Sequence, residues 1–445
     1  MGRYRRVSFL AGLIMFPALL FAQFNNNTTS PYSRFGLGEL HSYSFGRTTA
    51  MGGASLASRY NAQINTSNPA SYTAIDSLSF LFEFGIDGRF SNFQNDLGST
   101  TANDINFQYF AMSFQINNRI ATSLGLLPYS DIGYSVEVNE SIDEEYVGDV
   151  LTNYYGAGTV SNAYWGIAVE PIKNISVGVH LNYLFGKLNR NAEVYFRGVP
   201  IPDSNSLTGY TYTGSGNFYT IQQYSDFRLR DFGLDFGLQA TIPLKNDQHI
   251  VIGAVFENKP EYTALYSDIT QKNLSSSQGL VEQDTLNYVS EEKSSIDFPL
   301  SFGGGISYVR NNKLEINLDY YHQSWSDAKF FGAKSDFLTD LNKFAVGGEW
   351  IPNKFSIRSY LARIAYRAGV RYEETYLMFG DQQINDFGIS FGVGLPIYRS
   401  SSTINVAAEI GKKGTKENGL VLENYARLNL SVNLYDLWFV KRRFD

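Results

Sequence analysis

Strict alternation of apolar and polar residues constrains the fold of this chain more than any other sequence feature. In the segment FGLDFGLQATIPL, which begins at Phe232, apolar residues occupy every even-numbered position as far as Ile242. The odd-numbered positions between them hold glycine, aspartate, glutamine and threonine. A period of two describes a β-strand with one apolar and one polar face. Two folds accommodate such strands: a soluble sandwich with the polar face in water, and a membrane barrel with the polar face lining a lumen.

The same pattern recurs in segments spread over the whole chain. Apart from Leu184, apolar residues alternate with small or polar ones in the segments 175–185, 314–320, 387–395 and 426–434. A strand of about nine residues is long enough to cross a bilayer at a tilt. Beyond the first 22 residues there is no run of 18 apolar residues, so no transmembrane helix is expected.

Residues 1–22 have the pattern of a secretory signal peptide. Three arginines precede the apolar run FLAGLIMFPALLFA, and the small residue Ala22 ends it. Cleavage after Ala22 would change the net charge from −7 to −10, and this acidic balance disfavours nucleic acid as a partner. The absence of cysteine excludes a disulfide framework and a lipid attached to a cysteine. After a signal peptide, 31 Tyr, 33 Phe and 40 Gly suit a Gram-negative outer-membrane barrel better than a soluble periplasmic enzyme.

The connections between the alternating segments distinguish the two folds, because short, turn-like connections alternate with longer polar ones. The six short ones are 116–119, 171–174, 244–248, 310–313, 351–354 and 398–402, and the seven longer ones are 91–104, 129–159, 188–228, 259–296, 322–340, 373–384 and 412–423. An outer-membrane barrel has short periplasmic turns and long extracellular loops, whereas a sandwich has no reason to keep its long loops at one end. The pattern therefore predicts an all-β fold, a 14-stranded antiparallel transmembrane β-barrel over residues 77–445, with both termini periplasmic.

Residues 23–76 precede the first strand and do not alternate. A barrel of this size has internal space beyond its own side chains, and many lumen-facing positions are Gly or Ser. We therefore expect an N-terminal hatch inside the lumen, the alternative being a loose periplasmic tail. Pro69 restricts its own φ and biases Asn68 toward an extended conformation, while Gly52 and Gly53 allow close backbone approach.

Short motifs in this segment resemble the FadL/TodX family of outer-membrane transporters. In that family the hatch carries a run rich in Gly and Ala, followed by Asn-Pro-Ala. The matching hatch residues here are Gly52, Gly53, Ala54, Asn68, Pro69 and Ala70. LPYSDIGY (127–134) and SPYSRFGLGEL (30–40) also resemble the family, the second in a form typical of Bacteroidetes-type members. Strand number, hatch and C-terminal strand together extend the resemblance over the whole mature chain.

The resemblance implies passive transport of hydrophobic compounds such as long-chain fatty acids across the outer membrane, without a cofactor. The longest predicted loops are polar, unlike the apolar landing site of characterised family members. An alternative function is an accessory barrel subunit of a larger outer-membrane secretion or assembly complex. The expected partners are outer-membrane lipid and lipopolysaccharide, with a hydrophobic ligand in the first case and outer-membrane proteins in the second. A dry apolar cavity beside the hatch would favour transport, and a polar or filled lumen would favour the accessory role.

Catalytic and metal-binding patterns are absent from the sequence. The four histidines are His41, His180, His249 and His322, and their predicted positions lie at different levels of the barrel, so no nucleophile–base–acid cluster is expected. Zinc, nucleotide-binding and serine-hydrolase motifs do not occur. The acidic run at 140–149 could hold Ca²⁺ or bridge lipopolysaccharide, but it lacks the ligand spacing of a calcium loop and suits a solvated loop better. We therefore predict no enzymatic activity, no metal site and no bound cofactor.

Overall fold

The computed structural model describes most of the mature chain. The described residues are 27–41, 44–142, 148–202, 210–213, 219–258, 260–276, 279–311, 313–398 and 400–438. The predicted signal peptide and part of the acidic run at 140–149 lie outside these ranges. Among the described residues, no helix has the length and apolar character required to span a membrane.

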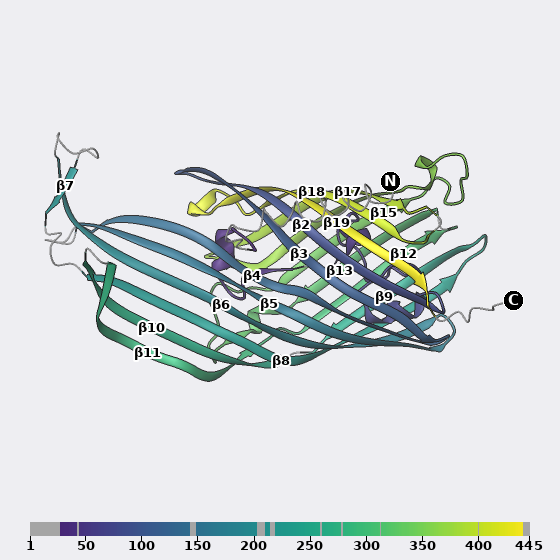
Figure 1. Ribbon diagram of the computed structural model, residues 1–445, viewed down its shortest axis with the longest axis horizontal. Helices are drawn as coiled ribbons and strands as arrows, with labels where there is room; N and C mark the ends of the chain where they lie inside the picture. The colour runs from purple at the N-terminus through teal and green to yellow at the C-terminus, as the bar shows by residue number, and fades with distance from the viewer. Residues whose placement is uncertain are drawn as a thin grey trace, which may run out of the picture.

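Fourteen antiparallel strands close a single barrel, as predicted (Figure 1). Closure occurs between the first and last strands, whose pairing runs from Leu422 opposite Gln94 to Leu437 opposite Ser79. In spatial order the wall strands are β2 (Ser79–Asn95), β3 (Gly98–Asn117), β4 (Ile120–Ile142), β5 (Gly148–Ile172), β6 (Ile175–Pro202), β8 (Tyr219–Pro243), β9 (Gln248–Glu257), β12 (Ser301–Arg310), β13 (Leu314–Gln323), β15 (Leu341–Trp350), β16 (Ala365–Phe379), β17 (Gln382–Pro396), β18 (Thr403–Lys413) and β19 (Leu422–Leu437). Every wall strand therefore has a paired neighbour on each side, although β3 and β4 pair only near the turn that joins them.

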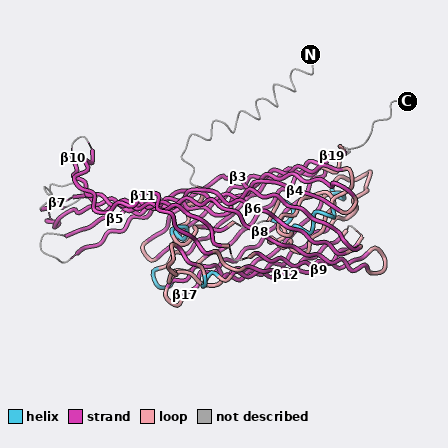
Figure 2. The backbone as a smooth tube through the Cα atoms, turned by 90° about the horizontal axis from the view of Figure 1, so that it is seen from below, coloured by secondary structure: helices cyan, strands magenta, loops and turns pink. Residues whose placement is uncertain are grey.

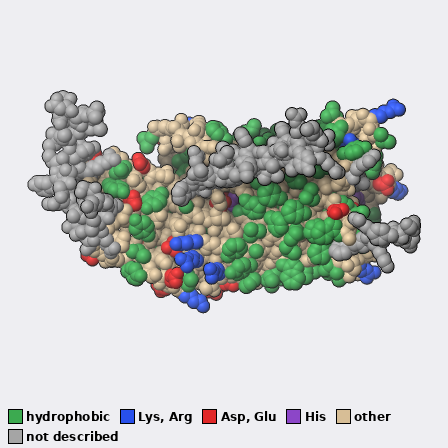
Figure 3. Space-filling model, in the orientation of Figure 1, with side chains coloured by type: hydrophobic (Ala, Val, Ile, Leu, Met, Phe, Trp, Pro, Cys, Tyr) green, Lys and Arg blue, Asp and Glu red, His purple; other side chains and the backbone are tan. Residues whose placement is uncertain are grey.

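The alternation of the sequence corresponds to the two faces of this wall. Leu181 and Leu234 point outward and are 37% and 45% exposed, whereas Asn182 and Gln239 point inward and are 5% and 1% exposed. On the face seen in Figure 3, apolar side chains gather over the barrel wall, and exposed large apolar residues occur on strands all around the barrel, for example Phe84, Leu318 and Phe391. The apolar faces of the strands can therefore contact lipid, and their polar faces line the lumen.

Five of the seven long polar segments that were expected to be loops are mostly strand. Segments 91–104 and 373–384 are tight hairpins that join β2 to β3 and β16 to β17. In the other three, 129–159, 188–228 and 259–296, the loop expectation is wrong as well. β4, β5, β6 and β8 continue through them as one sheet that projects beyond the barrel (Figure 2). Two additional strands, β10 (Glu261–Ser276) and β11 (Gly279–Asp297), form a hairpin that pairs with the upper part of β8, and the short β7 (Tyr210–Thr213) pairs with β6. Outside the membrane neither face of a strand requires lipid, so a polar sequence is compatible with a sheet there.

Residues 27–41 and 44–76 lie inside the lumen, where the hatch was predicted. Its regular elements are short: η2 (Pro31–Arg34), β1 (Glu39–Leu40), α2 (Gly46–Thr49) and η3 (Pro69–Ala74). Above it, η4 (Trp325–Asp327) and β14 (Lys329–Phe330) follow β13 and fold over the upper lumen, and η6 (Glu417–Gly419) connects β18 to β19. The side chain of Trp325 is completely buried in the apolar cluster at this level.

The opposite end of the barrel carries the short turns, with one exception. The turn expected at 351–354 is instead a connection from residue 351 to residue 364, which includes η5 (Leu361–Arg363).

Candidate functional site

The lower part of the hatch is joined to the wall by a buried cluster of charged groups. The Arg47 guanidinium donates from Nε to Glu349 at 2.9 Å and also pairs with Glu315 on the adjacent strand. Arg367 donates to the same Glu349 carboxylate at 2.7 Å. These four side chains are 6% exposed or less. A buried charge is stable only when it is paired, so the hatch and the wall depend on each other here.

Glycines of the wall allow the hatch backbone to approach closely. A Cβ on Gly369 would lie 2.1 Å from the carbonyl carbon of Met51, and one on Gly347 would lie 2.1 Å from its oxygen. The predicted residues Gly52 and Gly53 follow Met51 and have φ of +67° and +80°, which favours glycine. The Gly52 amide donates to the Ser390 hydroxyl at 2.8 Å.

The predicted residues Ala54, Asn68, Pro69 and Ala70 belong to the same contact surface. Asn68 is fully buried and donates to the carbonyl oxygens of Leu56, Leu238 and Ala254 at 2.8, 3.2 and 3.3 Å. Its side-chain oxygen accepts from the Ala70 amide, which caps η3, and Pro69 begins that helix. Ala54 and Ala70 are both completely buried. Five of the six predicted hatch residues therefore lie against the wall or within the hatch interior, and Gly53 lines the cavity above them.

The upper part of the hatch crosses a split in the wall. Among the described residues, β3 and β4 pair only where Phe110–Asn117 faces Ile120–Leu126. Above that point β1 of the hatch takes the free edge of β4, with Glu39 opposite Asp131. Asn27 bridges the two sides, because it donates to Asp131 at 3.1 Å and accepts from Asn106 of β3 at 2.6 Å.

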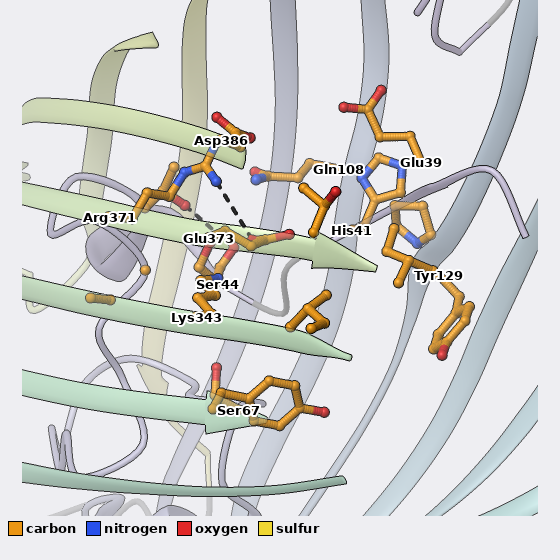
Figure 4. A pocket seen from close by; sticks show the side chains of 18 of the residues that line it. Glu39, His41, Ser44, Ser67, Gln108, Tyr129, Lys343, Arg371, Glu373 and Asp386 are labelled. Carbon is orange, nitrogen blue, oxygen red and sulfur yellow. Dashed lines mark hydrogen bonds and ion pairs between the residues drawn. The ribbon is translucent and has the colours of Figure 1, made fainter. Parts of the chain in front are cut away.

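A cavity of about 200 Å³ lies between the hatch and the upper wall (Figure 4). On one side Arg371 pairs with Asp386 at 3.0 Å and with Glu409 at 2.9 Å. Aromatic side chains such as Tyr129 and Tyr376 contribute apolar surface to the lining. The cavity is therefore amphiphilic and strongly charged, not a dry apolar pocket.

The opposite side of this cavity carries a second charged group, centred on Glu39 of the hatch. Arg89 and Lys413 both pair with Glu39, at 2.6 and 3.2 Å. His41 lies 2.5 Å from Asp131. Burial by itself would lower the pKa of His41, but the Asp131 carboxylate raises the pKa above the ordinary histidine value.

The residues that tie the hatch to the wall were only partly visible in the sequence. The Asn-Pro-Ala and Gly-Gly motifs identified the hatch side of the contact. Glu315 and Glu349 were not identified, because they lie 268 and 302 positions from Arg47 in the chain. One feature of the sequence could have identified them: each is a carboxylate on the polar face of a predicted membrane strand. Such a buried carboxylate needs a partner in the lumen. His180 hydrogen-bonds Tyr72 of the hatch at 2.6 Å and does not join the other histidines.

A family model described as BamG matches residues 5–445. No curated protein matches the sequence. Among solved structures, the Pseudomonas putida toluene transporter TodX is 15% identical, with a TM-score of 0.56 over 90% of this chain and all of that one. The monoaromatic hydrocarbon channel CymD is 14% identical, with a TM-score of 0.54 over 90% of this chain and 98% of that one. A FadL homologue from Pseudomonas aeruginosa is 11% identical, with a TM-score of 0.54 over 90% of this chain and all of that one. These similarities show a shared barrel fold.

Proposed function

Because the chain belongs to the BamG family and itself has the fold of FadL-type barrels, we propose that it is a closed accessory barrel of a larger outer-membrane secretion or assembly complex. The observation that carries this proposal is the way the lumen is filled. Buried ion pairs and backbone contacts hold the hatch at several levels of the wall. A hatch held in this way would stabilise the barrel as a structural subunit and would block the passage of a ligand through its lumen.

The chemistry of the cavity supports the same proposal. Pockets for drug-sized ligands usually measure about 300–1,000 Å³ and have mostly apolar walls. This cavity is smaller, and groups such as Arg371 and Glu409 line it. A hydrocarbon in this cavity would displace water from charged groups without replacing its hydrogen bonds, which is unfavourable.

The sheet extension offers a surface for protein partners. Its inner face continues the lumen-facing side of β4, β5 and β6, and it carries partly exposed Val136, Val138, Tyr154 and Val194. Within the described part of the extension, β11 pairs with a second strand only at Ile296 and Asp297 on its outer side, so most of that edge is open. Apolar residues on a broad face and an open strand edge are features through which proteins bind one another.

The test is the state of the tagged full-length protein extracted from its native outer membrane with a mild detergent. We expect a stoichiometric assembly larger than the 49.9 kDa chain, with cross-links from the extension to other outer-membrane proteins. Loss of the protein should then lower the amount of other barrels or secreted proteins at the cell surface. A monomer whose loss affects only the uptake of fatty acids or aromatic hydrocarbons would contradict the proposal.

Passive transport of hydrophobic compounds is the second candidate, and the split between β3 and β4 favours it. If residues 27–41 moved away, the upper lumen would open sideways between Phe107 and Leu127. The two candidates differ in a direct measurement, because a transporter should restore uptake of a radiolabelled fatty acid in cells that lack their own transporter. An accessory barrel should not.

A further inference from the structure

The connection 351–364 at the short-turn end exposes apolar side chains to an unusual degree. Phe355, Ile357 and Leu361 are 81%, 99% and 66% exposed. Elsewhere at this end the connections are tight turns, so nothing in the described chain covers these three side chains. A concentration of exposed large apolar residues in one loop marks a contact with lipid or with another molecule.

Basic residues accompany these apolar ones. Lys354 and Arg358 lie within the connection, and neither forms an ion pair with a described residue. The Lys354 ammonium lies over the ring of Tyr60 in the hatch, 5.6 Å from its centroid. Ion pairs with described residues are also absent from the basic residues in the neighbouring turns, which are Arg119, Lys173, Lys245, Arg310 and Lys313. In the lumen, by contrast, Arg47 and Arg371 are paired with carboxylates. The positive charge at this end is therefore not neutralised by any described carboxylate, and the contact of Lys354 with the Tyr60 ring leaves its charge in place.

The connection lies along the rim of the barrel. It starts directly below Trp350 and Tyr366, whose rings are 5.9 Å apart at the lower edge of the apolar outer face of the wall. The Tyr360 hydroxyl donates to the Pro396 carbonyl at 3.2 Å, which ties the connection to the end of β17. Beyond Pro396, Tyr398 is 69% exposed and continues the apolar surface. The exposed side chains are thus continuous with the apolar outer face of the wall.

We propose that residues 351–364 form an interfacial anchor in the periplasmic leaflet of the outer membrane. Phe355, Ile357 and Leu361 insert among the acyl chains at the head-group boundary. Lys354 and Arg358 bind the phosphates of anionic phospholipids, as basic residues beside an inserted apolar face do. The inference does not depend on the proposed function, since either kind of barrel could carry this anchor.

A single labelled cysteine tests the proposal, because the chain contains no cysteine of its own. The Ile357→Cys variant carries an environment-sensitive NBD label and is reconstituted into phosphatidylcholine vesicles with and without phosphatidylglycerol. We expect emission at shorter wavelength, quenching by lipids spin-labelled near the head group, and a stronger effect with phosphatidylglycerol. Leu97→Cys is the matched control, because Leu97 is 95% exposed at the β2–β3 hairpin and should report water in both vesicles.

A second variant separates the two halves of the proposal. Lys354→Gln with Arg358→Gln, in the Ile357→Cys background, should abolish the effect of phosphatidylglycerol and leave the folded barrel intact on unheated gels. An Ile357 label that reports water in both vesicles would overturn the anchor. Equal emission with and without phosphatidylglycerol would overturn the phosphate assignment.

Discussion

The hatch is held differently in its two parts. Residues 44–76 press against wall glycines and place Arg47 in a buried cluster of charges. Residues 27–41 lie across the split, where β1 pairs with β4 over two residues and Glu39 pairs with Arg89 and Lys413. Buried ion pairs and close backbone packing are costly to undo, while a short edge strand is not. The comparison teaches that one plug can be held in two ways, by close backbone packing over residues 44–76 and by a short strand pair with side-chain ion pairs over residues 27–41.

Removal of both parts should have the largest effect. Deletion of residues 24–70 should open the barrel to ions without unfolding it, since the wall closes through its own strand pairs. Single-channel conductance in planar bilayers measures this, with the full chain as the closed reference. If the intact protein already conducts like an open pore, the segment does not seal the lumen.

Arg47→Ala should weaken the attachment of residues 44–76 to the wall and leave that of residues 27–41 unchanged. It leaves Glu315 and Glu349 buried with Arg367 as the remaining cation, so we expect a loss of about 3–5 kcal/mol from the free energy that holds residues 44–76 in place. Hydrogen exchange of those residues, measured in nanodiscs, reports the change. Asn27→Ala, in the other part of the hatch, should cost about 1 kcal/mol and affect only the upper segment. Equal effects of the two substitutions would show that residues 27–41 and 44–76 are held equally strongly.

Asn68→Ala should weaken the attachment of residues 44–76 to the wall by an intermediate amount. The change leaves the carbonyl groups of Leu56, Leu238 and Ala254 without their shared donor and removes the cap of η3, which together cost about 1–3 kcal/mol. Hydrogen exchange at η3 is the measurement. Asn61→Ala serves as the control, since Asn61 is exposed and bonds only Asp76 of the hatch. A comparable loss from Asn61→Ala would show that the contacts of Asn68 with the wall do not stabilise the hatch more than an exposed hydrogen bond does.

The smallest effect concerns pH and the upper segment alone. Because Asp131 raises the pKa of His41 in the folded protein, the stabilisation by this pair is complete below the ordinary histidine pKa of about 6.5 and is lost as pH rises through the raised value. Hydrogen exchange of residues 27–41, corrected for its intrinsic pH dependence, should therefore accelerate as pH rises. His41→Gln should abolish this acceleration, and residues 44–76 should not show it. Acceleration that persists in His41→Gln would assign it to another group.

Much of the wall could be predicted from the sequence, because lipid demands a strict period of two. Leu181 and Asn182 reveal their faces directly, and the six turns between such strands determine how many strands there are. The strands beyond the membrane, as in the segment 188–228, could not be predicted in this way. Water and partners accept many patterns on a sheet, so a polar strand and a polar loop have similar sequences there.

The hatch was predictable as a segment and only partly as a site. Backbone requirements leave local signals, as Gly52 and Asn68 do. Contacts between distant charges leave none, and Arg47 could have paired with any lumen-facing carboxylate. The same limit applies to the cavity, whose charged lining depends on how β16, β18 and the hatch are placed together.

The β10–β11 hairpin is an insertion that barrel closure does not need. β9 and β12 pair with each other along their whole length, from Ser301 opposite Glu257 to Arg310 opposite Gln248, although residues 261–297 separate them in the chain. The hairpin could therefore lengthen, shorten or change sequence during evolution without altering strand number or shear. The membrane-embedded wall and the exposed extension can accordingly diverge at different rates, one limited by lipid and the other by whatever binds it.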